Sequence, residues 1–195
     1  MNYASKIILN IYSILILVMI LHQIIQRENQ SSKTDKIYKQ IVIFSIIMLI
    51  IDISRRFEGT GNPLYEVLNH GTNFLLFAFN LVIPSLWLLY VHTRVYDEQI
   101  RNKNLSYFLW GVNIVNTILI TISLKYGWIY YIDKNNIYHR GPYYAVTVIA
   151  TIILVVAAFI LIYKNKQAIP KRHYFALQFF CSPPNTWSCN SNIIL

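Results

Sequence analysis

The feature that most constrains this chain is a pair of long apolar runs without one charged residue. Residues 105–124 and 143–163 contain no Asp, Glu, Lys, Arg or His. Each run is about as long as a helix that crosses a bilayer, which needs roughly 20 residues. Three more apolar runs lie at residues 7–25, 41–53 and 67–91, and a sixth begins at His173 or Tyr174. We therefore predict an all-α integral membrane bundle of five to six transmembrane helices.

Composition agrees with a membrane protein. Hydrophobic residues make up 55% of the 195 residues and charged residues 13%, whereas about a quarter of a soluble domain is charged. The net charge of +9 sits in the links between apolar runs and forms no stripe, which favours lipid headgroups over nucleic acid as its partner. Cys181 and Cys189 have no metal-ligand spacing, so we expect no metal and no cofactor.

The distribution of Lys and Arg predicts the orientation of the chain. One alternate set of loops holds eleven of the 17 basic residues, and cytoplasmic loops carry such an excess. The N-terminus and the loop at residues 125–143 are therefore expected outside the plasma membrane. In this loop, IYYID and IYHRG flank the turn-forming KNN, which predicts a short extracellular hairpin with Asp133 and Arg140 near its two arms. Such a loop serves either as a binding surface or as a well-packed cap.

Several polar residues lie inside the predicted spans. Asp52 precedes Arg55 and Arg56 by three and four residues, which suits an interfacial ion pair, with a proton or ion site as the alternative. The other candidates are amides. Asn69, Asn73 and Asn80 share one face of the third span, and Asn113 and Asn116 are neighbours on the fourth. Such amides either join helices to one another or line a ligand cavity. Pro84 can kink the third span.

We find no catalytic motif in the sequence. It contains no Ser/His/Asp arrangement of the expected order, no phosphate-binding loop and no paired carboxylates in a link long enough to fold. We therefore expect that the chain is not an enzyme.

The last residues depart from the membrane pattern. YFALQFF begins a span at Tyr174, but CSPPNTWSCNSNIIL would then place many polar groups in hydrocarbon. Codons able to encode that string can, read one base later, spell the apolar VLPQILGAVIQILF. We hypothesise that residues 1–180 are a multi-span sensor-like domain and that residues 181–195 are a frameshifted tail. A natural polar tail is the alternative, and the DNA downstream decides between them.

The chain resembles a family through IYYIDKNNIYHRGPYY, the SLWLLY end of the third span and Asp52 at the end of the second. These residues are similar to the multi-span sensor region that precedes the GGDEF domain of bacterial, Firmicute-like diguanylate cyclases, and to related regions of histidine kinases. The resemblance implies seven spans and a cytoplasmic output domain in the intact protein. It also implies a set of candidate ligand-binding residues, namely Tyr131, Asp133, Asn136, Tyr138 and Arg140.

The resulting hypothesis is a membrane input module of a bacterial signalling protein without its output domain. Its expected partners are the lipid bilayer, a small extracellular ligand and a second copy of the chain. Two other classes stay open: a small transporter or channel component, and a structural membrane subunit.

Overall fold

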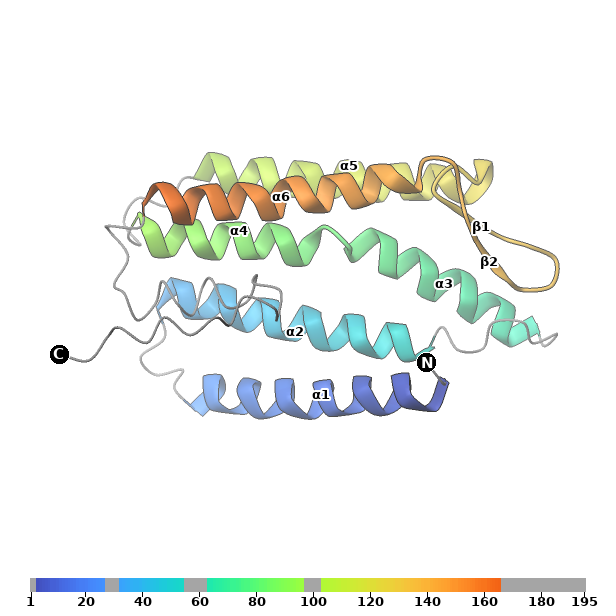
Figure 1. Cartoon of the computed structure of the whole chain (residues 1–195), viewed down its shortest axis with the longest axis horizontal. Coiled ribbons are helices and arrows are strands. Elements are labelled where there is room, and N and C mark those ends of the chain that lie inside the picture. Colours follow the sequence, from blue (N-terminus) through green and yellow to red (C-terminus); the bar gives the residue numbers. More distant parts are fainter. Residues whose placement is uncertain (1–2, 27–31, 55–62, 97–102, 166–195) are drawn as a thin grey trace, which may run out of the picture.

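The computed structural model describes residues 3–26, 32–54, 63–96 and 103–165, which form a predominantly helical bundle with a small hairpin at one end (Figure 1). The elements in chain order are α1 (Tyr3–Gln26), α2 (Lys33–Ser54), α3 (Pro63–Phe79), α4 (Val82–Val95), α5 (Lys103–Tyr126), β1 (Tyr130–Ile132), β2 (Tyr138–Arg140) and α6 (Tyr144–Lys164). The start of α1 lies at the same end of the bundle as the hairpin, which we call the hairpin end. We call the other end, where α1 and α6 finish, the opposite end.

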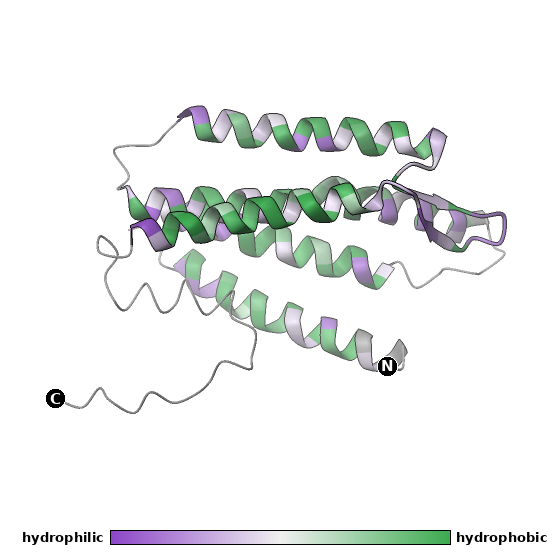
Figure 2. Cartoon of the chain, turned by 45° about the horizontal axis from the view of Figure 1, so that its top comes forward, coloured by the Kyte–Doolittle hydropathy of each residue, from purple (hydrophilic) through white to green (hydrophobic). Residues whose placement is uncertain are grey.

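Five stretches of the described residues are long and apolar enough to cross a membrane, with α3 and α4 together making one of them. Large apolar side chains cover their outer surfaces: the side chain of Met19 on α1 is 67% exposed and that of Ile153 on α6 is 61% exposed. Hydrophilic residues gather at helix ends and in the hairpin (Figure 2). Such surfaces suggest a membrane location. The predicted sixth span and the polar tail lie outside the described residues.

The second helix begins earlier than the apolar pattern predicts. The sequence predicted a span at residues 41–53, but α2 starts at Lys33. Ser32 and Asp35 form a reciprocal cap, in which the Asp35 N–H donates to Ser32 Oγ at 3.2 Å and the Ser32 N–H donates to Asp35 Oδ2 at 3.1 Å. This cap starts the helix two turns before its apolar part, because it satisfies N–H groups that have no partner within the helix.

The third predicted span, residues 67–91, is not one continuous helix. It is divided between α3 and α4, with Asn80 and Leu81 between them. Pro84 explains the position of the break, since proline has no N–H and its ring clashes with the carbonyl four residues earlier, here that of Asn80. The sequence indicated a kink, and the structure has a full interruption.

The break separates two hydrophobic clusters. Towards the opposite end, buried residues of the break, α4, α5 and α6 pack together: Leu81, Leu88, Val91, Leu109, Leu154, Ala158 and Ile162. Towards the hairpin end, Ile120 of α5 packs with Ile129 and Tyr130 of the hairpin arm. α4 packs on α6 and on α2, whereas α3 packs on α5 and on α2. The two halves of the broken span therefore have different partners on one side, α6 and α5, and share α2 on the other.

The predicted hairpin is confirmed, with β1 and β2 pairing antiparallel. Its base depends on two glycines. Gly127 has φ +66°, the left-handed conformation that ends helices, and its N–H donates to the Ser123 carbonyl at 2.8 Å. A Cβ on Gly141 would lie 2.4 Å from the carbonyl oxygens of both Gly127 and Trp128, so only glycine fits where the two ends of the hairpin meet.

Candidate functional site

The turn of the hairpin is organised by Asp133. Its Oδ1 accepts hydrogen bonds from the N–H groups of Asn135 and Ile137, both at 2.9 Å, and its Oδ2 lies 3.0 Å from His139 Nε2. The hydrogen bond from the Ile137 N–H, followed by the one from His139, lowers the pKa of Asp133 because these donors stabilise the carboxylate. Asn136 completes the turn with φ 59°, a conformation that asparagine tolerates well.

The strand register sorts the hairpin residues onto two faces. Tyr131 pairs with His139, and the two rings stack with their centroids 5.1 Å apart. Asp133 adjoins them through His139. Tyr130 pairs with Arg140 and Ile132 with Tyr138, so these residues share the other face. We call the surface of Tyr131, Asp133 and His139 the outward face of the hairpin.

The hairpin is attached to α3 by a chain of amides. Asn69 Nδ2 donates to the Asn136 carbonyl at 3.1 Å and to Asn136 Oδ1 at 2.8 Å. Asn73, one turn further along α3, donates to the side-chain and main-chain oxygens of Asn69 at 2.7 and 2.9 Å. All three residues are buried, and both Asn69 and Asn73 are at most 1% exposed. The amide chain therefore fixes the tip of the hairpin to one side of α3.

Aromatic packing supports the same attachment. The Phe77 ring of α3 stacks on Tyr130 with 4.9 Å between centroids, and the Tyr138 ring lies 6.2 Å from Phe77. The Tyr144 ring meets Phe77 edge-on, and the Arg140 guanidinium lies 4.8 Å from the Tyr144 ring centre. Burial raises the pKa of Tyr130 to about 12. We call Asn69, Asn73 and Phe77, with the hairpin residues they contact, the hairpin seat.

Two carbonyls beside the break accept hydrogen bonds from an amide of a neighbouring helix, and Asn80 at the break is itself bonded to α6. Asn116 Nδ2 of α5 donates to the carbonyls of Phe77 and Ala78 at 3.0 and 3.3 Å, in place of the helical N–H donors four residues on. Asn80 Nδ2 donates to Thr151 Oγ1 of α6 at 3.0 Å. An interrupted helix is tolerated in an apolar medium only where protein groups replace the missing bonds. Side chains of α5 and α6 therefore stabilise the interruption between α3 and α4.

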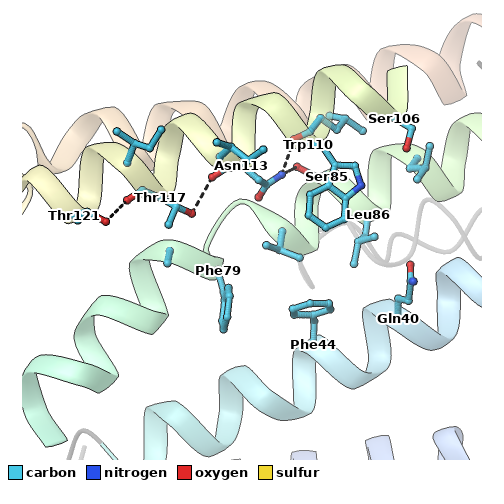
Figure 3. A pocket seen from close by; sticks show the side chains of 16 residues that line it. Gln40, Phe44, Phe79, Ser85, Leu86, Ser106, Trp110, Asn113, Thr117 and Thr121 are labelled. Carbon is cyan, nitrogen blue, oxygen red and sulfur yellow. Dashed lines mark hydrogen bonds between the residues drawn. The ribbon is translucent and has the colours of Figure 1, made fainter. Parts of the chain in front are cut away.

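A cavity of about 500 Å³ lies beside the break, between α2, α4 and α5 (Figure 3). Asn113 of α5 lies in its wall and donates its Nδ2 to Ser85 Oγ of α4 at 2.9 Å and to the Leu109 carbonyl at 2.8 Å. The Oδ1 atom of Asn113 is buried and has no hydrogen-bond partner among the described residues.

Asp52 has a partner that the sequence did not indicate. Its Oδ2 accepts a hydrogen bond from Asn10 Nδ2 of α1 at 2.9 Å, which joins α1 to α2 at the hairpin end. The predicted partners Arg55 and Arg56 lie outside the described residues.

The structure does not bring the five predicted ligand-binding residues to one surface. Tyr131 and Asp133 belong to the outward face, whereas Asn136 and Tyr138 are turned into the hairpin seat. Arg140 is exposed but shares its face with the seat residues. Sequence reasoning missed His139 and Phe77. The two-residue alternation across the hairpin would have placed His139 opposite Tyr131, but no local signal pairs Phe77 with the hairpin.

Chemistry at the outward face is limited to one carboxylate, one imidazole and one phenol ring. Within the part of the chain that the structure describes, no cluster of three or more His, Cys, Asp or Glu residues could hold a metal ion. Comparison of the chain with protein-family models, curated proteins and solved structures gives no match.

Proposed function

We propose that this chain is the membrane input module of a bacterial signalling protein, of the kind in which a multi-span region precedes a diguanylate cyclase or histidine kinase domain. The observation that carries the proposal is the attachment of the hairpin to α3, just ahead of the break. Asn69 binds Asn136, and Phe77 both stacks on the hairpin and lies at the break, where its carbonyl accepts hydrogen bonds from the Asn116 side chain and the Asn80 N–H. A stimulus that moves the hairpin would therefore also move α3, the helix that ends at the break.

In this proposal the hairpin and α3 move together relative to α4. The amide chain and the aromatic stack hold α3 to the hairpin, whereas α4 packs on α6 and on α2, and α2 also contacts α3. Asn80, which belongs to neither helix, contacts α6 through Thr151. A ligand or membrane condition that acts on the outward face would favour one of two packings of the broken span, and α4 and α6 would carry the change to the opposite end.

The proposed orientation places the hairpin end outside the cell and the opposite end in the cytoplasm. The excess of Lys and Arg in the alternate set of loops supports it. The N-terminus would then be outside, as a multi-pass protein of the plasma membrane. Labelling of a cysteine introduced at Lys134, in the exposed hairpin turn, by a membrane-impermeant reagent in intact cells tests this orientation.

Distance measurement across the opposite end tests the coupling. Spin labels replace Lys33, at the start of α2, and Lys164, at the end of α6, after Cys181 and Cys189 are changed to serine. Asn69→Leu removes the donor that holds the hairpin, and we expect it to shift the label distance or add a second population. His70→Leu is the matched control, because His70 is the next residue and is exposed.

Hydrogen exchange of the hairpin amides reports separately whether Asn69→Leu has released the hairpin. The proposal would be overturned if hydrogen exchange shows that the hairpin is released while the distance between the two spin labels stays the same. The hairpin end and the opposite end would then not be coupled.

A second candidate, a small transporter or channel component, is favoured by the broken span beside a cavity. Discontinuous helices with polar groups near the middle of the membrane are typical of transporter sites. Solute flux in proteoliposomes that is lost in Asn73→Leu would rank this function first. Stable co-purification with a partner complex would instead favour a structural membrane subunit.

A further inference from the structure

The cavity beside the break has the size of a ligand site. Its volume of about 500 Å³ falls within the roughly 300–1,000 Å³ of small-molecule pockets. Phe44 of α2, Phe79 and Leu86 of the broken span, and Trp110 of α5 line it (Figure 3). The wall is therefore mostly apolar and is contributed by three separate parts of the chain.

The cavity opens on the side of the bundle. Trp110, Ile114 and Ile118 form its edge along α5, and their side chains are 68%, 56% and 52% exposed. These residues lie at intervals of four along an apolar helix, so the opening faces the surroundings of that helix over about two turns. A ligand of this cavity would enter laterally, from the surrounding lipid.

Among the described residues of the wall, the one buried hydrogen-bonding group without a partner is an acceptor. Both donations from Asn113 Nδ2 are used within the protein, while Asn113 Oδ1 is buried and lacks a partner among the described residues. A ligand hydroxyl would supply the donor that Asn113 Oδ1 lacks, and lining side chains must move aside for it, because this oxygen has almost no exposed surface. Among the residues that the structure describes, none of those lining the cavity is charged, so it suits a neutral ligand.

We propose that this cavity binds a neutral, lipid-dissolved amphiphile with a long hydrocarbon chain and a hydroxyl head. The hydroxyl donates to Asn113 Oδ1, and the chain lies along Phe44, Phe79 and Leu86. Binding is independent of the proposed function. A further consequence, that the ligand holds α3 and α4 in one relative position, rests on the proposed function.

Photolabelling in lipid nanodiscs tests the site. The probe is hexadecanol with a diazirine in its chain, and its methyl ether is the matched probe without a donor. We expect saturable labelling of α2 and α5 peptides, displaced by unlabelled hexadecanol. The ether should bind about tenfold more weakly, as expected for the loss of one buried hydrogen bond. Labelling spread evenly over all the apolar helices would overturn the proposal.

Two pairs of variants locate the ligand. Ile118→Trp fills the edge of the cavity and should abolish saturable labelling, whereas Val115→Trp, at a similarly exposed position of α5 that does not line the cavity, should not.

Asn113→Leu removes the acceptor, while Ser85→Ala breaks the same interhelical bond and leaves Asn113 Oδ1 in place. We expect the preference for alcohol over ether to be lost in Asn113→Leu and kept in Ser85→Ala.

Unchanged labelling in a folded Ile118→Trp variant would exclude the cavity as the site. An alcohol preference that persists in Asn113→Leu would exclude Asn113 as the acceptor. Because these readouts measure binding and the spin-label experiment measures coupling, failure of the site and failure of the proposed function are distinguishable.

Discussion

Asn69 on α3 donates its side-chain amide to both the carbonyl and the side-chain oxygen of Asn136, 67 residues further along the chain. Both residues are buried, and the contact joins the tip of the hairpin to a helix that is interrupted three turns later. The geometry of the hairpin end therefore depends on one pair of amides and on the aromatic stack around Phe77.

Asn69→Leu should destabilise the protein by about 1–3 kcal/mol, because it removes two buried hydrogen bonds from Asn69 to Asn136. Thermal unfolding in detergent measures the stability, and hydrogen exchange should show the loss of protection concentrated in the hairpin. His70→Leu, at the exposed neighbouring position, should change stability by less than about 0.5 kcal/mol. Equal effects of the two variants would contradict the assigned role of Asn69.

Gly141→Ala should open the base of the hairpin. The added Cβ would meet two carbonyl oxygens at 2.4 Å, and we expect a loss of about 1–3 kcal/mol as the backbone shifts. Gly111→Ala on α5 is the contrasting variant, since a Cβ there meets nothing within 4 Å and alanine favours a helix by about 1 kcal/mol. Thermal unfolding should move in opposite directions for the two variants, and a stable Gly141→Ala would show that the base is not closely packed.

Acid should loosen the turn of the hairpin through Asp133. The pKa of this carboxyl is lowered in the folded protein, so its stabilisation is present above its ordinary pKa and is lost as the pH falls through the folded value. We expect the protection factors of the Asn135 and Ile137 amides to fall below about pH 4. Asp133→Asn keeps an acceptor oxygen and should remove this pH dependence. Protection that responds to acid in the same way in the unsubstituted protein and in Asp133→Asn would contradict the prediction.

Pro84→Ala should restore a continuous helix between α3 and α4, because residue 84 could then donate to the carbonyl of Asn80. Spin labels at Leu64 and Arg94, which are both exposed, measure the result. A continuous helix would separate these backbone positions by about 45 Å in a narrow distribution. Ile83→Ala is the control that leaves the proline in place. An unchanged distance in Pro84→Ala would mean that the amides of neighbouring helices, and not the proline, maintain the break.

Much of the fold was predictable because its signals are local. Runs of apolar residues about as long as a bilayer is thick predicted the five long stretches, and the KNN turn between β-prone segments predicted the hairpin. The start of α2 was missed because the Ser32 and Asp35 cap extends the helix into polar residues, which hydropathy alone does not detect.

The candidate site was less predictable, because its contacts join residues far apart in the sequence. Asn69, Asn73 and Asn80 were expected on one face of a single helix, but the break turns Asn80 to α6 while the other two serve the hairpin. Asp52 was matched with nearby arginines, and its partner in the structure is Asn10 of another helix. Amides and carboxylates accept many partners, so their spacing along the chain does not select one.

The amino-acid sequence by itself determined which segments are apolar helices and where a proline weakens one of them, because hydrophobicity and backbone chemistry belong to each residue. Only the tertiary structure decided that the weak point becomes a complete break, where Asn116 donates to two carbonyls and Asn80 binds Thr151 of α6. It also decided which hairpin residues face outward and which are buried against Phe77. The physical reason is that a freed carbonyl or a buried amide is stable only when a specific partner reaches it, and that partner is supplied by packing between distant segments.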